Sequence, residues 1–78
     1  MKVTKYFLAT RIRPDRCGIR DEWIERVIAQ PLRTQRQTDG RVRCWASIAE
    51  ADGRYLRVVL LEDAETVHNA FFDRDFIP

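Results

Sequence analysis

The sequence predicts an α+β fold in which an N-terminal helical segment packs on one face of a mainly antiparallel sheet of four to five strands. Residues 53–72 give the strongest signal, because two runs of β-branched and aromatic residues flank a short polar turn. Residues 21–30 carry apolar side chains at helical spacing. Asp39-Gly40 and Asp52-Gly53 are two-residue turn signals that separate further strands. The expected order is a strand, a short turn, a helix and then four strands in a meander.

The hairpin within this strongest segment is expected to turn at Glu62–Glu65. If Leu61 faces Thr66, uninterrupted pairing places Leu56 opposite Phe71. Side chains then alternate between the two faces, and one face becomes the core. The residues expected on this core face are Leu56, Val58, Leu60, Val67 and Phe71. Those expected on the opposite face are Tyr55, Arg57, Val59, Leu61, Thr66, His68 and Phe72.

The segment before this hairpin is predicted to contain one more strand and the helix. Val3–Leu8 is the expected strand, and Pro14 limits the following residues to one short helical turn. The helix is expected over Asp21–Gln30, with Asp21 as its N-cap and Pro31 stopping it. Its apolar stripe, which is expected to pack on the core face, consists of Trp23, Ile24, Val27 and Ile28.

Two further strands are expected near Arg33–Gln37 and over Val42–Ile48. Alternation along the second strand places Arg43 and Trp45 on the side opposite Cys44. No predicted element remains to cover the second face of the sheet. We therefore expect that face to be an open concave surface or to contact a second chain.

The composition indicates a single domain over residues 1–78 with a net charge of +2. Lys2 and Lys5 are the only lysines among 14 basic residues, and the planar guanidinium groups of the arginines suit phosphate well. An ordinary solvated surface of mixed charge is the alternative interpretation. No apolar run approaches the roughly 20 residues that span a bilayer, and no signal-peptide pattern is present. A cytoplasmic location without a membrane partner is therefore expected.

Cys17 and Cys44 are far apart and form no C-x-x-C motif. Two reduced thiols are therefore expected rather than a disulfide. No metal site is expected, because the chain has one histidine and no cluster of ligands at a metal-binding spacing. The sequence also lacks a glycine-rich phosphate loop, and no cofactor is expected.

Candidate chemistry falls on the second face of the central hairpin, where Arg57 and His68 lie close in the expected pairing. A histidine beside an arginine could transfer a proton during RNA cleavage while the arginine stabilises the charge on the phosphorane. The alternative for His68 is a half-buried structural residue. The alternative for Arg57 is an ion pair with a nearby carboxylate, for which the candidates are Glu62, Asp73 and Asp75.

Two runs of residues resemble known families. Tyr55–Leu60, followed by an acidic turn, another strand and Asp73-Arg74, resembles the C-terminal half of RelE-like ribonuclease toxins. Gly18–Pro31 resembles an uncharacterised bacterial family placed near that fold. The resemblance implies a sheet whose concave face engages RNA. It also implies that Arg57 and Arg74 stabilise the transition state of cleavage.

The catalytic candidates are therefore Arg57, Arg74 and His68, and Arg41, Arg43 and Arg54 stand loosely where such toxins have a basic RNA-binding cluster. Phe76 stands where several members have an aromatic residue with a hydroxyl group. Three functions remain open at this point. They are an RNA-cleaving toxin with an antitoxin partner, a non-catalytic relative that binds RNA or a protein, and a small interaction protein that forms a homodimer through the open face.

Overall fold

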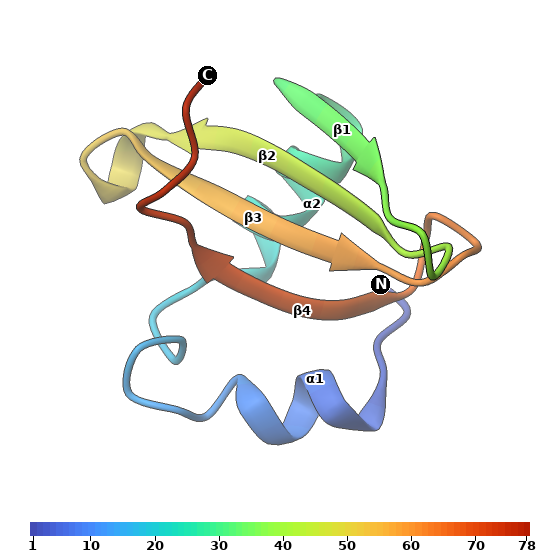
Figure 1. The fold of residues 1–78 in the computed structure, drawn as a ribbon. Helices are drawn as coiled ribbons and strands as arrows, with labels where there is room; N and C mark the ends of the chain where they lie inside the picture. Colours follow the sequence, from blue (N-terminus) through green and yellow to red (C-terminus); the bar gives the residue numbers. More distant parts are fainter.

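The computed structural model describes residues 1–78 as two helices and a four-stranded antiparallel sheet (Figure 1). The strands follow one another in the sheet in the order β1-β2-β3-β4. Helix α2 lies behind the sheet in Figure 1, and α1 lies beside β4. This arrangement confirms the α+β class and the four-stranded meander. The elements are α1 (Lys5–Thr10), α2 (Asp21–Ala29), β1 (Arg33–Arg36), β2 (Val42–Ile48), β3 (Arg54–Leu60) and β4 (Val67–Phe72).

The strand predicted over Val3–Leu8 is wrong, because most of this segment forms helix α1. The hydroxyl of Thr4 accepts a hydrogen bond from the backbone N–H of Phe7 at 3.0 Å and so caps the helix. Val3 alone keeps a strand-like contact, a parallel bridge to Val67. The ring of Phe7 is buried, and this one side chain anchors the short helix to the core.

Helix α2 confirms the predicted helix and ends one residue earlier than expected. Arg20, not Asp21, occupies the N-cap, and it makes no side-chain capping bond. Asp21 is instead the first helical residue, where its carboxylate favours the positive end of the helix dipole and pairs with Arg11. Ile24 and Val27 are buried as predicted, whereas the other two residues of the stripe are only partly buried.

The core lies between α2, α1 and the helix-side face of the sheet. Its fully buried side chains contact one another without a buried polar side chain among them. Burial of this apolar surface provides the main stabilisation of the domain. The sheet residues of this core are Val42, Cys44, Ile48, Leu56, Val58, Leu60, Val67 and Ala70.

Strand β4 contains a β-bulge that the sequence did not reveal. Pairing begins at the turn as predicted, with Leu60 opposite Val67, but Val59 then pairs with Asn69. His68 is the extra residue, and every later pair is shifted by one position. The prediction that Phe71 belongs to the core and Phe72 to the opposite face is therefore wrong. Phe71 pairs with Arg57 on the face away from α2, and Phe72 turns toward the helix side.

The turns between β1 and β2 and between β2 and β3 lie at Gly40 and Gly53, as the sequence predicts. Gly40 has a positive φ of 91°, and a Cβ atom there would come within 2.6 Å of the Glu62 side chain. A non-glycine residue would therefore be strained in its backbone and would also collide with the neighbouring turn. Gly53 likewise has a positive φ, of 73°, after a short 3-10 turn over Ala49–Ala51.

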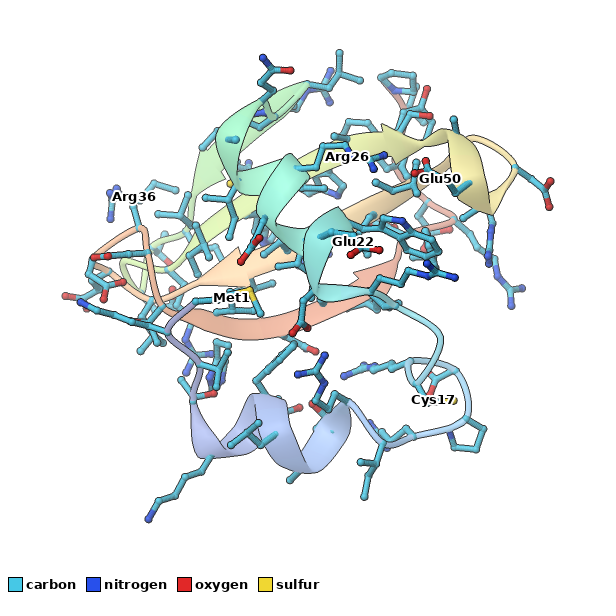
Figure 2. All side chains as sticks on the ribbon, turned by 180° about the vertical axis from the view of Figure 1, so that it is seen from behind. Met1, Cys17, Glu22, Arg26, Arg36 and Glu50 are labelled. Carbon is cyan, nitrogen blue, oxygen red and sulfur yellow. The ribbon has the colours of Figure 1, made fainter.

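The helix side of the molecule carries surface ion pairs. Figure 2 shows Arg26 of α2 lying against Glu50, and the two form paired hydrogen bonds of 2.9 and 2.8 Å. The hydrogen bond from Arg26 lowers the pKa of Glu50 to about 2. Neither helix of the protein is both long and apolar enough to cross a membrane.

Candidate nucleic-acid interface

The face of the sheet that points away from α2 carries the candidate site, and we call it the open face. Residues 73–78 run across one end of it, in front of β2 and β3 in Figure 1. The prediction that no segment covers this face is therefore only partly right. The strand residues of the open face are Arg33, Gln35, Arg43, Trp45, Ser47, Tyr55, Arg57, Val59, His68, Asn69 and Phe71.

Arg57 lies at the centre of the open face between two aromatic rings. Its guanidinium carbon is 5.7 Å from the ring centroid of Trp45 and 5.1 Å from that of Phe71. This geometry follows from the sheet register, because β3 pairs Arg57 directly with Trp45 on one side and with Phe71 on the other. The bulge at His68 is what brings Phe71 to this position.

Asp73 provides the counter-charge of Arg57. Its carboxylate lies 3.6 Å from a terminal nitrogen of Arg57 and accepts a hydrogen bond from the indole N–H of Trp45 at 2.9 Å. The backbone N–H of Asp75 donates to the same carboxylate. Burial on its own would raise the pKa of Asp73, but these donors and Arg57 hold that pKa below its usual value. The predicted alternative for Arg57, an ion pair with a nearby carboxylate, is confirmed, and Asp73 is the partner among the three candidates.

Further cations and rings flank this centre on both sides. Arg16 lies over the outer part of Phe71, with its guanidinium carbon 5.3 Å from the ring centroid. In the other direction Phe76 stacks on Trp45 at a centroid distance of 5.0 Å. Arg33 lies over Phe76, also at 5.0 Å. The resulting series crosses the sheet in the order Arg16, Phe71, Arg57, Trp45, Phe76, Arg33.

The open face is electropositive. Burial and then the neighbouring Arg43 lower the pKa of Arg57, against the opposite effect of Asp73. The guanidinium group remains protonated nevertheless, so two positive charges lie close together. Arg43 forms no ion pair with a carboxylate, and its nearest polar neighbour is the neutral amide of Gln37. The Nε atom of Arg57 is also buried without a hydrogen-bond acceptor.

His68 occupies the bulge and is held by the N-terminal segment. Its ring stacks on Tyr6 at 4.7 Å, and its Nδ1 lies 3.0 Å from the hydroxyl of Thr4. That hydroxyl also accepts from the N–H of Phe7, so Thr4 joins the ring of His68 to the start of α1. Burial and then Arg41 lower the pKa of His68, which favours the neutral imidazole.

Three of the predicted site residues meet at one hollow on the open face. Arg57, His68 and Arg41 line this hollow of about 410 Å³ with Asn69 and Phe71, and no carboxylate is among its lining residues. Arg43 lies on the same face, further along the sheet toward β1.

Arg54 and Arg74 lie elsewhere. They share a separate hollow of about 590 Å³ with Trp23 and Phe72, at the end of the sheet where α2 begins. The guanidinium of Arg54 stacks on Phe72 and donates to the carbonyl of Ala51. The structure therefore separates Arg74 from Arg57 and His68, and it separates Arg54 from Arg41 and Arg43.

Sequence reasoning did not select Trp45, Phe71 or Asp73 as members of an RNA-binding site. Alternation along Val42–Ile48 already put Trp45 beside Arg43, and this signal could have found it. The position of Phe71 could not be found in this way, because the bulge reverses the alternation before it.

No three His, Cys, Asp or Glu side chains come together as metal ligands. Cys17 is exposed on the loop before α2, visible at the edge of Figure 2, and Cys44 is buried in the core, so the two thiols are free. Burial raises the pKa of Cys44, which keeps this thiol protonated.

Comparison with known proteins adds no family assignment. No protein-family model, curated protein or solved structure gives a significant match to this chain. The RelE-like resemblance therefore depends on the sequence runs alone.

Proposed function

We propose that this protein binds single-stranded RNA on its open face and does not cleave it. The observation that carries the proposal is the alternation of guanidinium groups and aromatic rings across β4, β3 and β2, in the order Arg16, Phe71, Arg57, Trp45. Proteins that hold single strands combine these two elements, because cations attract the backbone while rings stack with the bases.

The charges around the open face favour an anionic ligand. Three of the five arginines on or beside it face a carboxylate, namely Arg16 at Asp15, Arg41 at Asp39 and Arg57 at Asp73, whereas Arg33 and Arg43 have no acidic partner. Tyr6 is exposed and Phe71 is half-buried, so ring surface remains available for bases. The arginines in question are Arg16, Arg33, Arg41, Arg43 and Arg57.

The resemblance to RelE-like toxins favours RNA as the nucleic acid. Cleavage is not what the geometry supports best, because it needs its catalytic groups held together around one phosphate. Arg57 and His68 line one hollow of the open face, whereas Arg74 lines the other hollow. Binding without cleavage needs only the arginines and rings of β2, β3 and β4.

The test is binding of a fluorescently labelled single-stranded oligouridylate, measured by anisotropy across a salt series. We expect binding that weakens as salt rises, since each phosphate neutralised contributes about 0.7 to the slope of log K against log salt for a single strand. Arg43→Gln should therefore lower this slope by about 0.7. Electrophoresis of the same RNA after incubation should show it intact.

Arg20→Gln is the matched control, because it removes the same charge from the helix side, where Arg20 is exposed at the start of α2. It should leave the slope unchanged. Absence of binding even at the lowest salt, or equal effects of the two variants, would overturn the proposal. If electrophoresis shows shortened RNA, and a variant of His68 no longer shortens it, RNA cleavage replaces the proposed function.

A further inference from the structure

We propose that residues 73–78 form a displaceable strap that occupies the RNA-binding surface until RNA replaces it. This inference depends on the proposed RNA binding and adds a mode of regulation to it. The segment places a carboxylate and an aromatic ring on the two central groups of the open face, Arg57 and Trp45. Single-stranded RNA offers the same pair of groups, a phosphate and a base.

Asp73 is the fixed end of the strap. Its backbone N–H donates to the carbonyl of Tyr55 at 2.9 Å, and its carboxylate binds the indole of Trp45 and faces Arg57. A phosphate oxygen at this position would find the same donors, because guanidinium groups bind carboxylate and phosphate in similar geometry. A ligand phosphate and the Asp73 carboxylate therefore compete for one place.

Phe76 is the second point of contact. Its ring lies nearly parallel to that of Trp45, with 18° between the planes, and also touches Tyr55 at a centroid distance of 5.0 Å. Trp45 is only 5% exposed as a result of this packing and of Arg57. A base can stack on Trp45 only after the ring of Phe76 has moved away.

The remainder of the strap is weakly held, which makes displacement feasible. Asp73 is the last residue with a backbone-to-backbone hydrogen bond, and the side chain of Ile77 is exposed. Arg33 donates to the carbonyl of Ile77 at 3.1 Å across an exposed surface. Segments with few buried contacts and few backbone hydrogen bonds open at low free-energy cost.

A hollow of about 610 Å³ separates the strap from β1 and β2, and Arg33, Arg43 and Arg57 line it. Arg33 is held there by Ile77 and Phe76, and Arg57 is held by Asp73, so Arg43 alone is available to a phosphate while the strap is closed. Arg43 would then attract the strand before Phe76 leaves Trp45. The geometry thus provides a first contact that does not need the strap to open.

The experiment compares Phe76→Ala with the parent protein in the oligouridylate assay. If the strap is closed about nine-tenths of the time, only about one-tenth of the protein can bind RNA. Removing the ring should then lower the apparent Kd about tenfold. Ile12→Ala is the control, because it truncates an exposed apolar side chain in the loop after α1, outside the strap. It should bind as the parent does. In the parent, the backbone amide signals of Asp75 and Phe76 in NMR spectra should move toward unstructured positions as RNA is added.

The outcomes separate the two proposals. Binding by the parent that becomes tighter in Phe76→Ala supports the strap. Binding by the parent that Phe76→Ala leaves equal or weakens overturns the strap and leaves RNA binding intact. No binding by either protein overturns the proposed function itself. Thermal denaturation of each variant establishes that it is folded in the assay.

Discussion

The two faces of the sheet use the same strands in opposite ways. The helix-side face buries aliphatic side chains such as Leu56 and Val58 against α2, with no polar side chain among the buried residues. The open face presents guanidinium groups between aromatic rings, with Asp73 as the most buried counter-charge. Most of the buried core therefore lies on the helix-side face, whereas Trp45 and Val59 are the buried residues of the open face.

The difference between the faces depends on one inserted residue. Without the bulge at His68, Phe71 would point into the core and Phe72 would lie beside Arg57. With it, both His68 and Asn69 line the open-face hollow, and Phe71 completes the aromatic neighbourhood of Arg57. Bulges often redirect a side chain next to a functional site in this way.

The largest expected effect is the loss of a core side chain on the helix-side face. Leu56→Ala should cost about 2–5 kcal/mol, because it leaves a cavity beneath α2. For a domain this small, that loss is a large part of the total stability. Leu61→Ala removes the same atoms from a half-exposed position at the turn and should cost much less. Equal shifts of the two denaturation midpoints in urea would contradict the assignment of the core.

Deletion of single residues in β4 tests the bulge. Deleting His68 removes the extra residue and leaves Asn69, Ala70 and Phe71 on their present faces, so the protein should still fold with a loss of about 1 kcal/mol or less. Deleting Ala70 instead places the amide of Asn69 in the core, which should cost at least about 2 kcal/mol. Chemical denaturation of both deletions measures the difference. If the His68 deletion is the more damaging, the bulge is not a removable insertion.

Asp73 should matter for stability as well as for binding. Asp73→Ala strands the indole N–H of Trp45 and leaves the largely buried Arg57 without its counter-charge, which should cost about 1–3 kcal/mol. Asp73→Asn keeps an acceptor for Trp45 and should cost less. Midpoints of urea denaturation distinguish the two variants. An unchanged urea midpoint of Asp73→Ala would show that Trp45 and Arg57 find other hydrogen-bond partners.

The smallest expected effect is a dependence of stability on mildly acidic pH through His68. Because folding lowers the pKa of His68, the unfolded chain binds this proton more readily than the folded protein. Stability should therefore decrease as pH falls through the ordinary histidine pKa of about 6.5 and level off below the folded pKa. Stability should decrease further at lower pH, because the carboxylate of Asp73, whose pKa folding lowers, becomes protonated there.

His68→Gln is the control for this pH effect, since it has no titrating group at that position. Its urea midpoint should stay flat between about pH 7.5 and pH 5, where histidine alone among the unperturbed side chains titrates. A parent protein that is equally flat over this range would contradict the lowered pKa of His68.

The strongly patterned parts of the fold could be predicted from the sequence. Helix α2, strand β2 and the turns at Gly40 and Gly53 have local signals, namely apolar periodicity and residues that accept a positive φ. Helix α1 has little such pattern, because only Phe7 is buried and the capping by Thr4 decides the structure. The bulge has no local signal at all, since it is fixed by packing on both faces of β4.

The candidate site was predictable only where it follows alternation along intact strands. Arg57 was placed on the open face correctly, and Arg41 and Arg43 lie on the same side of the sheet. Arg74 and Arg54 were grouped with them through the family resemblance, and their positions depend on a tail and a strand end that alternation does not determine. The strap contact between Phe76 and Trp45 joins residues that are distant in the sequence, and no spacing rule predicts it.

The most direct test of the account is an NMR titration that maps where RNA contacts the protein. Single-stranded oligouridylate is added to isotope-labelled protein, and the shifts of the backbone amides are followed. We expect the largest changes at Arg43, Trp45, Arg57 and Phe71, with Ile24 and Val27 of α2 unaffected. Changes that cluster on α2, or that spread evenly over both faces, would contradict the assignment of the open face as the binding surface.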